Sequence, residues 1–275
     1  MNAPAARYQR QQHDHTREHA AGGTIYTPWT QDAVPSRNAV ALAFGLATAI
    51  VIAEYLARRV LAPGLPILGA PVVNDMWVSA LIYGILLTLV TPPAQRSTAT
   101  LGRALRGVLV AATSWLPWIG AVLFLGLVVA ITPFEVQLWG GFRLPSFAVP
   151  PASTVLLAGA AGPLSIGSLL LVNGLVIPLA EERLWRGLIQ PRLVVAWGML
   201  PGLFVTAVLF SLKHVILDAS LGRFVALTAG GLVLGAVAYR ASRVGRPGSG
   251  WKTSAVTHIA GNLVATSLAL LAGTM

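Results

Sequence analysis

Apolar stretches about as long as a membrane-spanning helix recur along this 275-residue sequence from residue 39 onward. A helix needs about 20 apolar residues to cross the roughly 30 Å of hydrocarbon in a bilayer. Seven stretches meet or approach this length: Ala39–Ala57, Met76–Thr91, Gly107–Ile131, Leu164–Val195, Gly202–Leu217, Phe224–Ala241 and Thr253–Ala272. They predict an all-α, polytopic membrane bundle of about seven transmembrane helices. A shorter apolar piece, residues 154–161, would make eight if it also crosses.

The composition supports a membrane protein and limits its chemistry. Hydrophobic residues make up 55% of the chain and charged residues only 10%, which is far from the usual balance of a soluble domain. The sequence has no cysteine, which excludes disulfides, thiol nucleophiles and cysteine-ligated metals. Glu, His, Asp and Ser are therefore the side chains left to carry chemistry.

The positive charge is distributed in a way that orients the chain. The net charge is +10, but the basic residues lie mainly between apolar runs, so we expect no nucleic-acid partner. With seven helices, Lys and Arg are more frequent on the segments that share a side with the N-terminus, and this bias predicts a cytoplasmic N-terminus. We expect a disordered cytoplasmic tail over residues 1–37 and a multi-pass domain over residues 38–275, located in the cell (inner) membrane.

The segment "LAEERLWRGLIQ", residues 179–190, places charged side chains inside an apolar run. An ionised side chain at the bilayer centre costs about 2.5 to 3.5 kcal/mol on insertion scales, so such residues usually face a polar interior. One interpretation ends the helix at Ala180 and puts Glu181, Glu182, Arg183 and Arg186 in a loop. The other continues the helix to the turn signal "GMLPG" at residues 198–202.

The positions of two histidines favour the continuous helix. Glu182 and His214 are equidistant from Gly198, so in an antiparallel hairpin they lie at the same depth. On the last apolar run His258 and Asn262 are four residues apart and share a helical face. We therefore expect carboxylates and imidazoles from three helices to line one water-accessible pocket.

Other polar residues are assigned simpler roles. Glu54 and Glu135 lie near predicted helix ends, where exposure at the membrane interface is expected. Asn173 is expected to hydrogen-bond a neighbouring helix. Gly231 and Gly235 form a small-residue step that allows two helices to approach closely.

Three motifs in order carry a family resemblance. "EERLWRG" fits Glu-Glu-x-x-x-Arg, "FSLKH" fits Phe-x-x-x-His, and "HIAGN" fits His-x-x-x-Asn. The chain thus resembles the CPBP family of CAAX-protease and bacteriocin-processing (Abi) intramembrane proteases over about residues 164–270. The resemblance implies that Glu181 with His214 activates water, and that His258 and Asn262 stabilise the oxyanion. Lys213 departs from the small or apolar residue typical of the family at that position, and it lies one residue off the motif face.

Two chemical alternatives stay open at this point. Arg186 is four residues from Glu182 and can keep it ionised, which leaves Glu181 as the group that accepts a proton from water. Alternatively His214, His258 and Glu181 are the three protein ligands of a catalytic zinc. We favour no cofactor, because the His-Glu-x-x-His helix of many zinc proteases is absent from the sequence.

The functional hypothesis is hydrolysis of a peptide bond in a membrane-associated protein that is prenylated, bacteriocin-like or C-terminally anchored. A transporter or proton-coupled channel is an alternative, because buried Glu, His and Arg also form ion relays. A non-catalytic, immunity-type membrane protein is a second alternative. Grouping of the polar residues toward one side of the membrane favours the protease.

Overall fold

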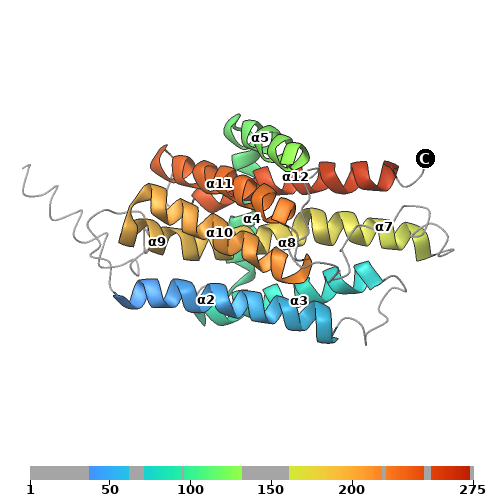
Figure 1. Ribbon diagram of the computed structural model, residues 1–275, viewed down its shortest axis with the longest axis horizontal. Helices are drawn as coiled ribbons and strands as arrows, with labels where there is room; N and C mark the ends of the chain where they lie inside the picture. Colours follow the sequence, from blue (N-terminus) through green and yellow to red (C-terminus); the bar gives the residue numbers. More distant parts are fainter. Residues whose placement is uncertain are drawn as a thin grey trace, which may run out of the picture.

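The computed structural model describes residues 37–61, 71–93, 96–131, 161–218, 221–244 and 249–272. Every regular element in these ranges is helical (Figure 1), which confirms the predicted all-α class. The predicted tail, the apolar piece before residue 161 and Glu135 lie outside the described residues, apart from Arg37 and Ala161, which begin helices.

The helices follow the predicted apolar runs closely. In chain order they are α2 (Arg37–Leu56), the π-helix η1 (Ala57–Leu61), α3 (Pro71–Val90), α4 (Thr98–Ala112), α5 (Leu116–Ile131), α7 (Ala161–Leu171), the π-helix η4 (Val172–Val176), α8 (Ile177–Leu184), the π-helix η5 (Trp185–Ile189), α9 (Gln190–Trp197), α10 (Met199–Asp218), α11 (Leu221–Val244) and α12 (Ser249–Ala272).

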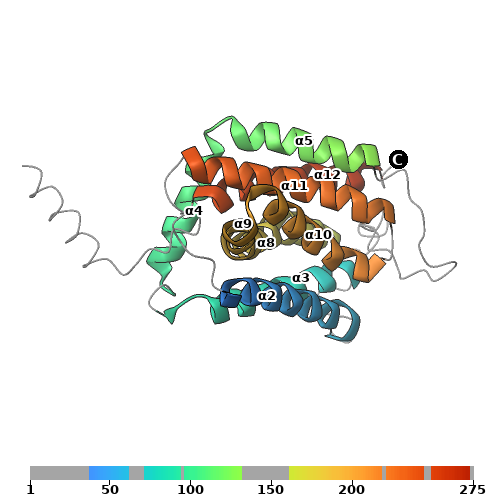
Figure 2. The same cartoon turned by 60° about the vertical axis from the view of Figure 1, so that its left-hand side comes forward.

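The segment from α7 to α9 is one continuous helix through the middle of the bundle, seen nearly end-on in Figure 2. Both of its π turns come directly before a proline-containing turn, with Pro178 in α8 and Pro191 in α9. Proline has no N–H and its ring clashes with the carbonyl four residues earlier. A wider π turn at that point absorbs the clash, so the helix continues past Ala180 and the loop interpretation of the charged segment is wrong.

A tight reversal follows at the predicted turn. Gly198 has a φ of 86°, a conformation that favours glycine, and it separates α9 from α10. The two helices then pack closely, because a Cβ on Gly202 would lie only 2.6 Å from the backbone of Val194. This hairpin sets the register between α8 and α10.

The run Gly107–Ile131, predicted as one helix, is two helices. Residues 100–112 of α4 and residues 116–131 of α5 meet at an angle of 80°, and α4 runs across the end of the bundle in Figure 2. The hydroxyls of Thr113 and Ser114 donate to the carbonyls of Val110 and Ala111, and Pro117 opens the next helix. These hydroxyl bonds and the proline end α4.

Among the described residues two helices are long and apolar enough to cross a membrane, Asn38–Leu56 and Leu221–Val244, and the bent α4–α5 pair would be a third. The count of seven transmembrane helices therefore stays a prediction. The outer surface is strongly apolar, with Leu81, Leu89 and Val122 each more than 60% exposed. An apolar surface of this kind suits contact with lipid.

The core lies around the central helix. Leu184, Trp185, Ile189 and Leu193 are fully buried in one cluster with side chains of α2, α3 and α10. The ring of Trp185 meets the edge of Phe210 at 5.6 Å between centroids. This packing fixes the central helix against α10, and so it also fixes the residues of α8 that come just before Leu184.

Candidate active site

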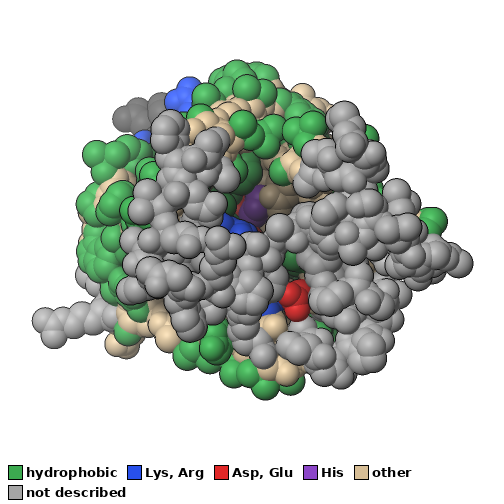
Figure 3. Space-filling model, turned by 45° about the vertical axis from the view of Figure 1, so that its right-hand side comes forward, with side chains coloured by type: hydrophobic (Ala, Val, Ile, Leu, Met, Phe, Trp, Pro, Cys, Tyr) green, Lys and Arg blue, Asp and Glu red, His purple; other side chains and the backbone are tan. Residues whose placement is uncertain are grey.

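A cavity of about 190 Å³ lies inside the bundle next to α8. It is lined by Arg58, Met76, Phe124, Asn173, Ile177, Glu181, Phe210, His214, Arg223, Leu227, His258 and Asn262. Figure 3 shows a histidine and a basic side chain at the bottom of a hollow on this face of the molecule. Of the predicted site residues, Glu181, His214, His258 and Asn262 meet at the cavity, whereas Glu182 and Arg186 lie behind it.

Glu182 is completely buried and holds His258 in place. Its Oε1 accepts a hydrogen bond from Arg186 at 3.0 Å and contacts His258 Nδ1 at 2.9 Å. Its Oε2 accepts one from Ser254 at 2.5 Å. A carboxylate paired with arginine has no proton to give, so Nδ1 of His258 is the donor. The other ring nitrogen, Nε2, is then directed to the cavity side, 3.9 Å from Glu181 Oε2.

Arg186 is fixed on several sides. Besides Glu182 it donates to the carbonyl of Gly231 at 3.2 Å, and its guanidinium lies 4.4 Å from the centroid of the Phe210 ring. The step at Gly231 makes this possible, since a Cβ there would lie 3.2 Å from Ala207. The predicted close approach of helices at this glycine is confirmed, between α11 and α10.

The two oxygens of Glu181 have different surroundings. Oε1 accepts a hydrogen bond from the ammonium of Lys213 and lies 3.0 Å from the hydroxyl oxygen of Tyr83. Oε2 is the oxygen nearer His258, at 3.9 Å from Nε2. Glu181 is therefore anchored through one oxygen and presents the other to the groups around the cavity.

A buried charge cluster lies behind Glu181, formed by Glu54, Arg58, Tyr83, Lys213 and Glu181 itself. Glu54 pairs with Arg58 at 2.5 Å and with Lys213 at 3.1 Å, and it accepts a hydrogen bond from the Tyr83 hydroxyl at 2.5 Å. Lys213 also donates to Tyr83 at 2.6 Å. Glu54 is only 2% exposed, so its expected exposure is wrong, because it has ionic partners inside the bundle.

Tyr83 links the two carboxylates through a single proton. Its hydroxyl lies 2.5 Å from Glu54 and 3.0 Å from Glu181 while accepting from Lys213. A hydroxyl has one hydrogen to donate, so it serves only one ionised carboxylate at a time. The shorter distance favours Glu54 as the acceptor.

His214 and Asn262 face the same cavity with part of their hydrogen-bonding capacity unused within it. His214 Nδ1 lies 3.0 Å from the carbonyl of Phe210, one turn earlier, and so is the donor. Asn262 donates through Nδ2 to the backbone carbonyl of Asn173 at 3.1 Å, and an amide has a second N–H. Asn173 in turn donates to Thr266 of α12 at 3.0 Å, which confirms its predicted role in helix packing.

The proposed zinc ligands do not form a metal-ligand group in this arrangement. No set of three or more His, Asp or Glu side chains in the described part of the chain is arranged to hold a metal ion. Preference for a cofactor-free site stays a prediction that elemental analysis must test. Arg183 stands apart from the cavity, half-buried, with its guanidinium 5.3 Å from the Trp251 ring.

The sequence contained two signals for the residues that were not predicted at the site. Glu54 and Arg58 are four residues apart, the spacing of a helical ion pair; Glu54 lies near the end of the run Ala39–Ala57 and Arg58 directly follows it. Lys213 is 32 residues from Glu181, as His214 is from Glu182. Depth alone would thus have indicated a carboxylate–ammonium pair, although Lys213 lies one residue off the motif face.

The fold and the site define a class of protein: a helical membrane bundle in which carboxylate, imidazole and amide groups from separate helices meet at one internal cavity. Residues 163–264, which run from α7 into α12, match the family described as type II CAAX prenyl endopeptidase, Rce1-like. The predicted resemblance is confirmed over these residues, which are similar to that family. The match and the apolar helices indicate an integral membrane protein, and the family that matches is one of CAAX prenyl endopeptidases. Comparisons with curated proteins and with solved structures found no match.

Proposed function

We propose that this protein hydrolyses a peptide bond of a membrane-associated protein with a water molecule activated by Glu181 and His214. The observation that carries the proposal is that Glu181, His214, His258 and Asn262, from three helices, face one cavity of about 190 Å³. The family description makes a prenylated C-terminal sequence the first substrate to test. Bacteriocin-like and C-terminally anchored substrates are the other candidates.

In the proposed reaction Glu181 Oε2 accepts a proton from water while His214 Nε2 orients the same molecule. The hydroxide attacks the peptide carbonyl and forms a tetrahedral intermediate whose oxyanion needs hydrogen-bond donors. Asn262 supplies its second N–H, and His258 supplies Nε2–H when both ring nitrogens are protonated. The proton held by Glu181 then passes to the leaving amine as the C–N bond breaks.

Glu182 and Arg186 act as positioning residues in this scheme. The carboxylate of Glu182 compensates the charge of a doubly protonated His258, and Arg186 and Ser254 hold that carboxylate in place. Because the resulting ion network is buried, its members exert their effect at short range and in low dielectric. They influence the reaction through His258, without touching the substrate.

We place the protein in the cell (inner) membrane with a cytoplasmic N-terminus. The excess of Lys and Arg on segments predicted to share that side supports the orientation. The start of α12, which lies about two and a half turns before His258, would then be near the cytoplasmic surface. A substrate anchored in the inner leaflet could reach the cavity from that side.

The test is turnover in proteoliposomes of a fluorogenic peptide that ends in a farnesylated CAAX-type sequence. We expect Glu181→Gln to lower kcat by about 10² to 10⁴, the usual range for loss of a general base. Asn262→Ala should lower it by about 10² to 10³, as for one oxyanion donor. Arg106→Gln, on the exposed surface of α4, is the control.

Thermal unfolding in detergent checks that each variant is folded, and Asn262→Ala leaves the charge cluster intact. Turnover by Glu181→Gln and Asn262→Ala at the rate of the control would overturn the mechanism. Unprenylated and C-terminally anchored versions of the peptide identify the substrate class. Proton flux through the same vesicles without any cleavage would support the transporter alternative instead.

A further inference from the structure

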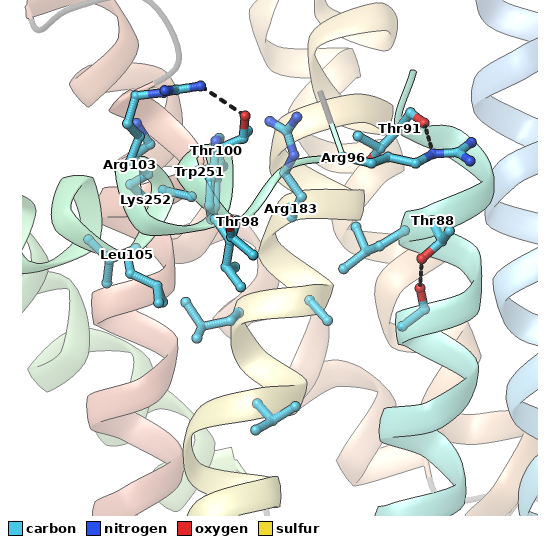
Figure 4. Close-up of a pocket in the computed structure, with 18 of the residues that line it drawn as sticks. Thr88, Thr91, Arg96, Thr98, Thr100, Arg103, Leu105, Arg183, Trp251 and Lys252 are labelled. Atoms are coloured by element: carbon cyan, nitrogen blue, oxygen red, sulfur yellow. Dashed lines mark hydrogen bonds between the residues drawn. The ribbon is translucent and has the colours of Figure 1, made fainter. Parts of the chain in front are cut away.

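A second and larger cavity, of about 830 Å³, opens between α3, α4, α8 and α12 (Figure 4). It shares no lining residue with the cavity at Glu181. Apolar surface forms most of its wall, including that of Leu87, Leu105, Val108, Val176 and Leu179. Its volume is in the range of pockets that hold small organic ligands, about 300 to 1,000 Å³.

Four basic side chains line the same cavity: Arg96, Arg103, Arg183 and Lys252. Figure 4 shows them gathered toward one end, with apolar side chains extending away from them. Their contacts are with neutral groups. Arg96 donates to the carbonyl of Thr91 at 2.7 Å, and Arg103 donates to the Thr100 hydroxyl at 2.8 Å.

Arg183 and Lys252 lie near the ring of Trp251, at 5.3 and 5.9 Å from its centroid. Within the described part of the chain no carboxylate forms an ion pair with any of the four basic residues. The cavity therefore has an apolar body and one end with a concentrated, uncompensated positive charge.

The bend at residues 113–115 bears on where this charged end would lie in a bilayer. The α4 helix meets α5 at 80°, so if α5 crosses the membrane, α4 lies along its surface. Arg96, two residues before α4, and Arg103, within α4, are then at the interface, and the apolar wall extends into the hydrocarbon. The cavity thus has a charged end and an apolar body, which match the charged headgroup and the apolar acyl chains of a phospholipid.

We propose that this cavity binds one anionic diacyl glycerophospholipid, with its phosphate among the four basic side chains and its acyl chains along the aliphatic wall. Basic pockets between membrane helices are suited to anionic headgroups. A zwitterionic headgroup would add a cation to a site that already has four. Free phosphate would leave the apolar wall unoccupied.

The first test measures binding of phosphatidylglycerol to the purified full chain by native mass spectrometry, with phosphatidylcholine as the comparison lipid. A basic residue near a headgroup contributes about 1 kcal/mol, which corresponds to about fivefold in affinity. We expect Arg103→Gln to weaken phosphatidylglycerol binding about fivefold, and Arg103→Gln with Lys252→Gln about 25-fold. Arg106→Gln, three residues along α4 and outside the cavity, is the matched control.

The second test fills the apolar part without changing charge. A Cβ on Gly84, which lines the cavity, would meet no atom within 4 Å, and the same holds for Gly45 on α2, which does not line it. Gly84→Phe should therefore abolish phosphatidylglycerol binding while the protein still folds. Gly45→Phe should bind as the unaltered protein does.

Equal affinity for phosphatidylglycerol and phosphatidylcholine would overturn the proposal, as would equal losses in Arg103→Gln and Arg106→Gln. Displacement of the lipid by inorganic phosphate would show a simple anion site. If a farnesylated peptide displaced the bound lipid and excess phosphatidylglycerol did not displace the peptide, the cavity would be assigned to a substrate chain instead. None of these readouts requires protease activity, so the proposal stands or fails separately from the proposed function.

Discussion

Replacing Lys213 by methionine tests whether the buried charge cluster is a balanced unit. The cluster contains two carboxylates, Glu54 and Glu181, and two cations, Arg58 and Lys213. Lys213 is only 2% exposed and contacts both carboxylates. Methionine keeps much of the length of the lysine stem, so the change removes charge more than volume.

Removal of one partner from a buried ion pair leaves the other charge uncompensated and costs about 3 to 5 kcal/mol. We therefore expect Lys213→Met to lower the free energy of unfolding by that amount. Glu54→Gln combined with Lys213→Met restores the balance, with Arg58 opposite Glu181. The double variant should recover at least about 2 kcal/mol relative to the sum of the single changes, near the upper end of couplings between adjacent groups.

The assay is reversible unfolding in mixed detergent micelles, followed by circular dichroism, for the two single variants and the double variant. Lys252→Met is the control, because Lys252 is half-buried and has no ion pair among the described residues; it should cost less than about 1 kcal/mol. A loss below about 1 kcal/mol in Lys213→Met, or strictly additive single effects, would show that the cluster is not an energetic unit and would refute this reasoning.

Three further predictions concern the site and its frame. Ser254→Ala removes a hydrogen bond to the buried Glu182 carboxylate and should cost about 1.5 to 3 kcal/mol in the same assay; an unchanged unfolding curve would contradict the assigned bond. Gly231→Val pushes a side chain against Ala207, 3.2 Å from the added Cβ, and should cost about 1 to 3 kcal/mol. Gly126→Val, where a Cβ meets nothing within 4 Å, should be nearly neutral, and equal losses in both would argue against close packing at Gly231. Turnover should survive prolonged treatment with a metal chelator, and elemental analysis should find no stoichiometric zinc; chelator-sensitive activity restored by zinc would favour the metal alternative.

Much of the architecture could be predicted because apolar length and turn signals are local properties of the sequence. The runs that became α2, α10, α11 and α12 were predicted within a few residues, and the reversal at Gly198 was read from its flanking residues. The break between α4 and α5 was not predicted. It depends on hydroxyl groups that cap carbonyls inside an otherwise continuous apolar stretch, and hydropathy does not register such bonds.

The site was predicted in part, for a similar reason. His258 and Asn262 share a helical face in the sequence, and equal distance from Gly198 placed α8 opposite α10 at the correct depth. The sequence did not show how α10 is rotated about its own axis, and therefore which of its side chains face the site. Both Lys213 and His214 contribute to the site, the first to the carboxylate of Glu181 and the second to the cavity wall. Glu54 was missed because two of its partners, Tyr83 and Lys213, come from distant parts of the chain, and its spacing to Arg58 was not considered.

Because α2 and α3 contribute side chains to the charge cluster, a fragment that keeps the cluster complete must include both helices. A fragment of residues 163–264 would retain every motif side chain, but it would lack Glu54 and Tyr83. Lys213 and Oε1 of Glu181 would then be exposed to lipid. The region that carries the proposed site therefore cannot be excised intact at the borders of the family match. Chimaeras that graft those residues onto a different N-terminal half would need to bring a tyrosine and a carboxylate to the same place.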